Sequence, residues 1–364
     1  MSELERIKIT TNEVADARVD ELVKRDQEAR RPAAPANREP PRVPFYYNPM
    51  WVYTFAGAIG AITNWAILEP FVSERNRNEG GVNMLASLLL FPLTGAFVGL
   101  FIAMSDAALS RNISRALYCG VVGLVIGFIA GIAGSIVGNI VFYFLTQLAF
   151  SFIPQSSIQS GHFSIEDING IAFFLLMVGR ALAWTLVATG MGLGQGIALK
   201  SKKLVLNGLV GGVIGGFIGG LAFDPIDKML HGAAESSGAA SRFFGLMAVG
   251  MAVGFFMGLV ENMAKDAWLY MKAGPLAGKQ FVIYKDPTTL GSSPKCDIYL
   301  FKDAAIEPNH AELRAVGTRY QLKDLGSRQG TFVNGKQVDS HMLQPGDTVV
   351  LGETVLEYAE RERK

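Results

Sequence analysis

A stretch of 217 residues with almost no charge dominates this sequence. Residues 46–262 carry only 20 charged side chains, whereas residues 1–45 carry 18 and residues 263–364 carry 27. The same stretch holds 32 of the 41 glycines. Because a soluble domain needs a charged outer surface, we predict that residues 46–262 form a polytopic helical transmembrane domain that contacts the lipid bilayer.

The rest of the composition excludes several function classes. The chain has 33 basic and 32 acidic residues, so no broad cationic surface predicts binding to nucleic acid. Its two cysteines, Cys119 and Cys296, lie in different regions and predict no disulfide. The four histidines show no metal-ligand spacing, and no glycine-rich loop carries the lysine of a phosphate site. We therefore expect no metal, no cofactor and no enzymatic activity.

A membrane crossing needs about 20 mostly apolar residues. Because residues 119–152 carry no charge, they allow a seventh crossing as an alternative, but this would place Lys200, Lys202 and Lys203 outside, against the positive-inside rule. We therefore interpret 138–152 and 169–179 as apolar extensions on the outer side that pack on each other. The six predicted spans are about 50–71, 82–104, 116–137, 180–199, 204–223 and 243–262.

Basic residues predict the orientation of these spans. Arg111 and Arg115 mark one loop and residues 200–203, Lys-Ser-Lys-Lys, mark another, whereas residues 153–168 carry no basic residue. Loop 73–81 opposes this pattern with two arginines. The balance predicts a plasma (inner) membrane protein with both termini in the cytoplasm. Residues 1–45 are then a disordered or partly helical cytoplasmic tail.

Glycines recur with the same spacing in two spans, which indicates an internal repeat: a helix pair, a second helix pair and then a single helix. Spacings of three and four residues keep glycines on one helix face, so that helix backbones approach closely. This favours a packed bundle over a pore. Arg180 and Arg242 stand at matched positions before the glycines of their spans. The helix-packing glycines are Gly120, Gly123, Gly127 and Gly131, and Gly208, Gly211, Gly215 and Gly219.

The pattern changes after the last span. Residues 263–274 are predicted to form a linker helix, and from 275 to 361 short runs with a period of two alternate with turn signals. The runs are QFVIY, CDIYLF, HAELRAV, RYQLKDL, GTFVN, DTVVL and TVLEYA. Many short strands at regular spacing predict an all-β sandwich.

Four ordered segments in this region carry a family resemblance: LGSSPKCDIYL, NHAEL, DLGSRQGTFVNG and LQPGDTVVLG. Residues 275–361 resemble a forkhead-associated (FHA) domain, about a quarter of the chain. The resemblance implies an eleven-stranded β-sandwich whose loops at one end bind phosphothreonine peptides.

The family's binding residues are only partly present. The resemblance places Gly291-Ser292 where the family has Gly-Arg, Glu307 where it has a phosphate-binding serine, and Gln329 where it has an asparagine. Pro308 replaces the arginine that commonly follows that serine. Arg328 and Lys295 lie in neighbouring loops. The matching residues are the structural His310, Gly330, Thr331 and Gly335, together with Asn334 at a peptide-binding position.

Charge decides what these differences predict. A phosphothreonine carries about −1.5 to −2 charges and is held by charge-assisted donors. Glu307 adds repulsion where a hydroxyl would donate, so we predict a degenerate phosphothreonine pocket. The sequence thus predicts a membrane adaptor or scaffold in signalling, with a protein partner, a neighbouring subunit or the chain's own N-terminal tail bound by the FHA-type module. The alternative is a small channel or transporter that this module regulates.

Overall fold

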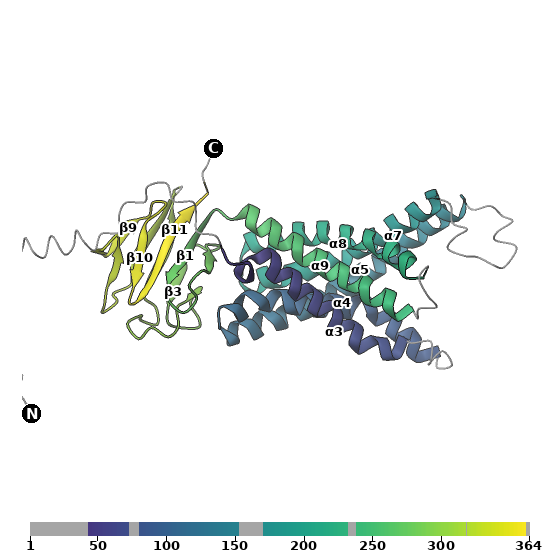
Figure 1. Ribbon diagram of the computed structural model, residues 1–364, viewed down its shortest axis with the longest axis horizontal. Helices are drawn as coiled ribbons and strands as arrows, with labels where there is room; N and C mark the ends of the chain where they lie inside the picture. Colours follow the sequence, from purple (N-terminus) through teal and green to yellow (C-terminus); the bar gives the residue numbers. More distant parts are fainter. Residues whose placement is uncertain (1–42, 73–79, 153–169, 232–237, 318, 362–364) are drawn as a thin grey trace, which may run out of the picture. The chain divides into compact units, whose positions relative to one another are not determined.

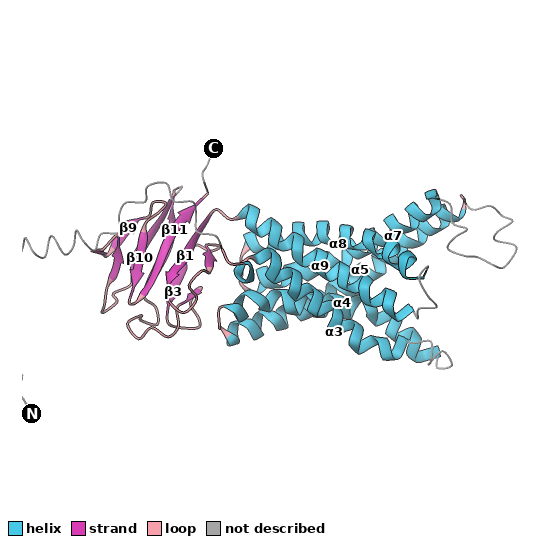
Figure 2. Cartoon of the chain, viewed as in Figure 1, coloured by secondary structure: helices cyan, strands magenta, loops and turns pink. Residues whose placement is uncertain are grey.

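The computed structural model describes residues 43–72, 80–152, 170–231, 238–317 and 319–361. The predicted N-terminal tail, loop 73–81 and loop 153–168 fall almost entirely outside these residues. The chain divides into a helical unit, Val43–Asp266, and a β unit, Ala267–Phe281 with Asp286–Lys364, while Val282–Lys285 groups with the helical unit. Figure 2 shows helices in the first unit and strands in the second.

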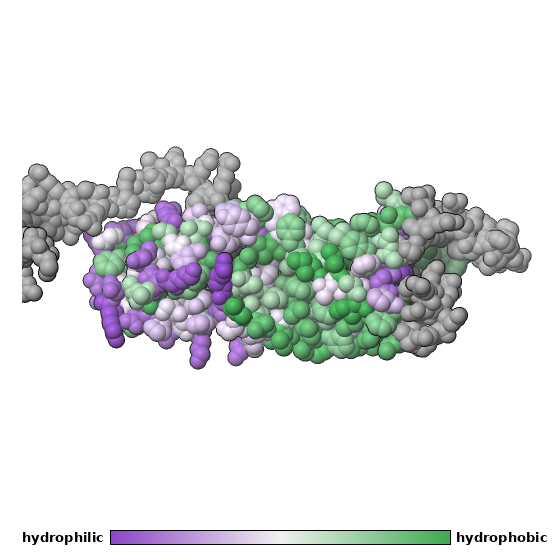
Figure 3. All heavy atoms as spheres, turned by 60° about the horizontal axis from the view of Figure 1, so that its bottom comes forward, coloured by the Kyte–Doolittle hydropathy of each residue, from purple (hydrophilic) through white to green (hydrophobic). Residues whose placement is uncertain are grey.

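All six predicted spans are present as helices that are long and apolar enough to cross a membrane, which confirms their number among the described residues. On the face that Figure 3 presents, hydrophobic residues predominate on this unit. Apart from a short 3-10 turn, η1 (Phe45–Tyr47), the helices are α3 (Pro49–Val72), α4 (Gly80–Leu109), α5 (Ile113–Phe150), α7 (Gly170–Ala198), α8 (Lys202–His231) and α9 (Gly238–Ala264).

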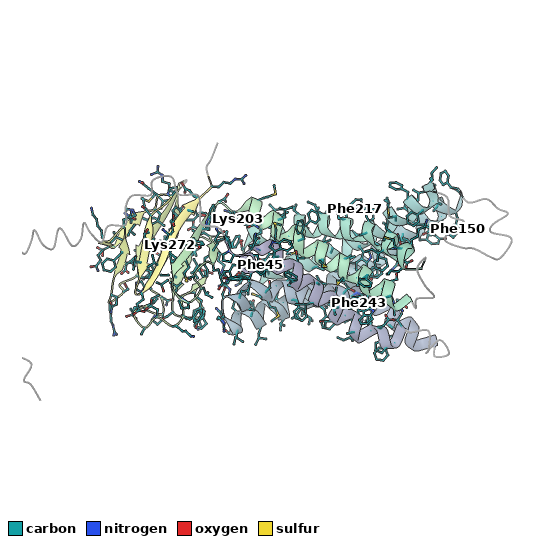
Figure 4. The ribbon with its side chains drawn as sticks, in the orientation of Figure 1. Phe45, Phe150, Lys203, Phe217, Phe243 and Lys272 are labelled. Carbon is teal, nitrogen blue, oxygen red and sulfur yellow. The ribbon has the colours of Figure 1, made fainter. Side chains whose placement is uncertain are left out.

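Two helices run further than the predicted spans. Helix α5 has 38 residues, and at 1.5 Å per residue it is about 57 Å long. Helix α7 begins at Gly170, ten residues before the predicted start of its span. The extensions pack on each other as expected, with Ala149 of α5 and Ala172 of α7 in one buried cluster. Figure 1 shows the ends of α5 and α7 extending past those of the other helices, and Figure 4 places Phe150 there.

The helices form a closed ring in the order α4, α5, α7, α8, α9 and α3, with α3 packed against α4. Helix α9, which follows the two helix pairs along the chain, packs against α3 from the start of the helical unit. Close glycine contacts join the three pairs. A Cβ atom built on Gly99 would lie 2.7 Å from Gly123 O, and one built on Gly212 would lie 2.6 Å from Ala188 O. A Cβ atom built on Gly57 would lie 2.8 Å from the carbonyl carbon of Gly250.

The predicted glycine ladders are buried but face different neighbours. Gly123 and Gly131 of α5 face α4, as the spacing predicts. In α8, Gly208 faces α7, whereas Gly211, Gly215 and Gly219 face α9. Helix α8 therefore has two glycine faces, because glycines at 212, 216 and 220 extend the face toward α7.

The interior of the ring is filled with apolar side chains. Val98 and Ile102 of α4 pack with Val187 of α7 and with Val249 and Val253 of α9, and each is at most 1% exposed. Close packing of this kind is the expected association force in lipid. The described part of the helical unit is therefore a packed bundle, as predicted.

Two turns at the same end of the bundle have the same hydrogen bonds. In the α4–α5 turn the N–H of Asn112 donates to Ala107 O, and in the α7–α8 turn the N–H of Ser201 donates to Gly196 O, each five residues back. Arg111 and Lys200 precede these residues and have φ angles of 57° and 53°. The two helix pairs thus reverse direction in the same way.

The β unit is a sandwich of two sheets. One has the order β2-β1-β11-β10-β7-β8 and the other β4-β3-β5-β6-β9, which confirms eleven strands. The strands are β1 (Ala267–Ala273), β2 (Gln280–Val282), β3 (Thr288–Gly291), β4 (Ile298–Tyr299), β5 (Ala311–Val316), β6 (Arg319–Asp324), β7 (Thr331–Val333), β8 (Lys336–Val338), β9 (Ser340–Met342), β10 (Thr348–Leu351) and β11 (Thr354–Glu360).

The predicted linker helix over 263–274 is wrong. Helix α9 ends at Ala264, and β1 begins at Ala267 and pairs with β11 in antiparallel register. Ala267, Leu269 and Met271 are each 1% exposed, so alternate side chains enter the core of the sandwich. The β unit therefore starts eight residues before the predicted boundary at 275.

Candidate peptide-binding loops

Three loops of the β unit carry the predicted binding positions. They follow β3, β4 and β6, and we name them loop A (292–297), loop B (300–310) and loop C (325–330). Loop A is fixed to loop B by backbone hydrogen bonds, from Ser292 N to Glu307 O at 3.0 Å and from Ser293 N to Pro308 O at 3.2 Å. The predicted positions Ser292 and Glu307 are thus neighbours.

Gly291 is needed for this approach. A Cβ atom built on it would lie 3.0 Å from Glu307 O and would overlap the carbonyl group of Pro308. The hydroxyl of Ser292 donates to Ile306 O at 2.7 Å, so its proton is used within the loops. Cys296 is buried, and its thiol contacts Pro308 O at 3.0 Å. The glycine at this position is therefore explained by packing between loops A and B.

His310 connects loops B and C, as expected of a structural residue. It is fully buried, its Nδ1 accepts from Glu307 N at 3.2 Å, and its Nε2 lies 3.4 Å from Gly330 O. Since Nδ1 is an acceptor, the ring proton is on Nε2 and faces the carbonyl group of Gly330. Gly330 has a φ of 77°, which favours glycine.

Asp324, which is not among the residues predicted from the sequence, holds loop C through its carboxylate. Its carboxylate accepts hydrogen bonds from Gly326 N, from Ser327 N and Oγ, and from Thr331 Oγ1, at 2.6–2.9 Å. Burial acts to raise the pKa of Asp324, but these hydrogen bonds outweigh burial and hold that pKa below its usual value. An aspartate two residues before a glycine is a typical Asx-turn signal and predicts this role.

Arg328 and Glu307 come together across loops B and C. Arg328 Nε lies 3.5 Å from Glu307 Oε1, and the Arg328 side chain is 92% exposed against 33% for Glu307. Such an exposed pair contributes about 0–1 kcal/mol. The arginine therefore partly neutralises the carboxylate and remains accessible. Gln329 and Lys295 are exposed in loops C and A.

Asn334 lies elsewhere, which corrects its placement among the binding residues. It follows β7, whereas Gln329 and Gly330 precede it, so Asn334 is at the other end of the strand. Its Nδ2 donates to Asp347 Oδ1 at 2.7 Å, and its Oδ1 accepts from Thr348 N at 2.9 Å. Both groups hold the β7–β8 turn, which Gly335 completes with a φ of 78°.

Comparisons with known proteins identify the β unit. The family model described as FHA domain matches residues 288–352. "Glycogen accumulation regulator GarA" of Mycolicibacterium smegmatis is 41% identical over 24% of this chain and 54% of the relative. An "Oxoglutarate dehydrogenase inhibitor" of Corynebacterium jeikeium is 38% identical over 26% of this chain and 65% of the relative, and that of Corynebacterium diphtheriae is 37% identical over 29% and 72%.

The chain thus spans 54% of the length of the first of these relatives and 65% of the length of the second. A crystal structure of the FhaA FHA domain complexed with the intracellular domain of Rv3910 is 26% identical, covers 25% of this chain and 98% of that chain, and has a TM-score of 0.24. FHA domains are protein-interaction modules. Through its C-terminal residues the chain belongs to the FHA-domain family.

Proposed function

We propose that this protein is an integral membrane adaptor that presents an FHA domain to protein partners in the cytoplasm. One observation carries the proposal: an FHA domain directly follows six helices that are long and apolar enough to span a bilayer. The two turns that carry Arg111 and Lys200 support a cytoplasmic position for that end of the bundle. The membrane is then the plasma membrane, and both termini are cytoplasmic.

The role is binding rather than catalysis, and the phosphothreonine pocket is degenerate. Glu307 occupies the position where the family's serine would donate to phosphate, and it already contacts Arg328. A phosphate group would have to compete with this carboxylate for the guanidinium group while being repelled by it. The partner is therefore a protein segment without a phosphate group, from another protein or from a second copy of this chain.

The filled interior of the bundle supports an anchoring role over the alternative of a channel or transporter. Glu261 is 7% exposed and accepts a hydrogen bond from Tyr53 Oη at 2.8 Å, so this buried carboxylate is partnered within the bundle. We further propose that the three helix pairs are an internal glycine-rich repeat. Self-association and contact with lipid belong to the same proposal.

The test is a binding experiment with the full chain in nonionic detergent against paired peptide libraries, one phosphorylated on threonine and one plain. We expect capture of the same plain sequences whether or not threonine is phosphorylated. Capture that depends on phosphate at micromolar affinity would refute the degenerate pocket. Orientation is tested separately by labelling a cysteine at Ser157 in intact cells with an impermeant reagent, where no labelling would contradict the proposed topology.

A further inference from the structure

Two arginines at matched positions of the glycine pattern are paired very differently. Arg242 of α9 donates to Glu69 of α3 through Nε at 2.9 Å and through an Nη atom at 2.6 Å, a bidentate pair. Arg180 of α7 has its Nε 2.8 Å from Asp224 Oδ1 of α8, an ion pair in which neither this Nε nor Oδ2 of Asp224 has a well-aligned hydrogen bond to a described residue. The guanidinium group of Arg180 donates no hydrogen bond to any residue that the structure describes.

Arg180 also borders a cavity, which adds a second observation. The cavity has a volume of about 180 Å³, whereas a water molecule occupies about 30 Å³ in the liquid, so it holds a group of several heavy atoms. Helices α4, α5 and α7 form its walls. The lining residues are Phe91, Ser135, Asn139, Phe142, Arg180 and Ala183.

The polar groups of this cavity suit an anion that carries oxygen atoms. The Arg180 side chain is 38% exposed and lies over the Phe142 ring, with its Cζ 5.7 Å from the ring centroid. Its planar fork of N–H donors matches a phosphate group. Asn139 Nδ2 uses one proton on Ser135 O at 2.7 Å, and its second N–H remains for a ligand. Ser135 Oγ donates to Ile132 O at 2.8 Å, which leaves its lone pairs to accept from a ligand hydroxyl.

The depth of Arg180 indicates the source of the phosphate group. Arg180 lies 18 residues before the end of α7 at Ala198, or about 27 Å along the helix. The hydrocarbon core of a bilayer is about 30 Å thick. If α7 ends at the cytoplasmic boundary, Arg180 lies at the outer boundary of the core, next to lipid phosphates. Phe91 and Phe142 then supply an apolar wall for the glycerol and acyl groups below.

We infer that Arg180, Asn139 and Ser135 form a binding site for the phosphate head group of a phospholipid in the outer leaflet. This inference rests on the proposed membrane insertion and orientation but not on the FHA domain. The bidentate partner of Arg242 explains why a second site of this kind is not expected at the matched position. Bound lipid would share the Arg180 guanidinium group with Asp224 and supply the acceptors that Asp224 leaves unfilled. In contrast to the loops around Glu307, this site offers a second donor, the Asn139 amide.

The test measures thermal unfolding of the full chain in nonionic detergent with dioleoylphosphatidylglycerol, with dioleoylglycerol and with inorganic phosphate, together with lipid retention in native mass spectrometry. We expect phosphatidylglycerol to raise the melting temperature by several degrees and to be retained, whereas dioleoylglycerol has no effect. A shift with inorganic phosphate alone that requires Arg180 would support the anion site and make a soluble phosphate compound its source.

Variants separate the site from general lipid contact. Arg180→Gln should weaken the lipid-dependent shift at least tenfold in lipid concentration, and Asn139→Leu, on an exposed position of α5, should weaken it without threatening the fold. The matched control is the double variant Glu69→Gln with Arg242→Gln, which removes the other ion pair and should keep the lipid effect. Equal shifts in Arg180→Gln and wild type, or equal loss in the control, would overturn the site while leaving the proposed adaptor role intact.

Discussion

Replacing Gly215 with alanine tests the helix contacts most directly. A Cβ atom at this position would lie 2.5 Å from Val253 Cα and 2.7 Å from Ala252 O of α9. Because carbon atoms ordinarily approach to about 3.5–4.0 Å, α8 and α9 would have to separate by about 1–1.5 Å. Both contacted atoms belong to the backbone of α9, so rotation of a side chain cannot relieve the overlap.

Two opposing effects set the magnitude. Overpacking of this kind costs about 1–3 kcal/mol, while the higher helix propensity of alanine returns about 1 kcal/mol. The net destabilisation is then about 0–2 kcal/mol, which in a unit of this size lowers the melting temperature by at most roughly 4–8 °C. Gly215→Leu should be far more severe, because three further carbon atoms enter the same contact.

The matched control is Gly120→Ala in α5. There the nearest atoms are Leu100 Cδ1 at 3.0 Å and Met104 Cβ at 3.3 Å, and the nearest backbone atom is 3.7 Å away. A flexible leucine side chain can move, so helix propensity should dominate and the melting temperature should stay level or rise slightly. Unfolding is followed by gel filtration of heated, detergent-solubilised full chain. Equal behaviour of the two variants, or a stabilised Gly215→Ala, would refute the close-contact reasoning.

Four further predictions follow from the contacts described. Ser292→Arg combined with Glu307→Ser should create micromolar, phosphate-dependent peptide binding by fluorescence anisotropy, and wild-type affinity in this variant would show that these positions do not control the pocket. Because the pKa of Asp324 is lowered in the folded state, the contribution of its carboxylate to stability is complete above the unfolded pKa of about 3.9 and is lost as the pH falls through the lower folded value. Asp324→Asn should therefore reduce the loss of stability of the β unit at acidic pH, measured as the pH dependence of its unfolding. An unchanged pH dependence would contradict this. Tyr53→Phe removes a hydrogen bond to the buried carboxylate of Glu261 and should cost about 1.5–3 kcal/mol in thermal unfolding of the helical unit, so that an unaltered melting temperature speaks against that bond. Liposomes containing the full chain should show the same ion flux as empty liposomes, and a reproducible excess would favour the channel alternative.

The helical unit was predictable where charge and length mark a span. Six helices follow from the low charge of residues 46–262, but the end of α5 does not, because residues 138–150 carry no charge that marks where a membrane would end. The pairing of α3 with α9 was also hidden. Its contact joins Gly57 and Gly250, and α3 carries too few glycines to show the repeat spacing.

The β unit was predictable where strands follow turn signals and where the family resemblance fixes positions. Strand β1 was missed because no glycine or proline separates residues 267–273 from α9, and only pairing with β11 decides for a strand. The resemblance indicated His310, Glu307 and Ser292, but the direction of Arg328 depends on loop geometry that spacing cannot give. Asn334 matched a motif yet serves a turn, because its amide is already satisfied by Asp347.

The closure of the ring by the first and last helices has a consequence for biosynthesis. About 190 residues separate the glycines that join α3 to α9, and ribosomes add roughly 5–20 residues per second. Helix α3 therefore lacks its α9 partner for about 10–40 s after synthesis, with the face around Gly57 unoccupied, while the α4–α5 and α7–α8 pairs are already complete. Membrane chaperones and quality-control proteases can act on an open assembly of five helices during this interval. The interval ends when α9 leaves the ribosome and closes the ring.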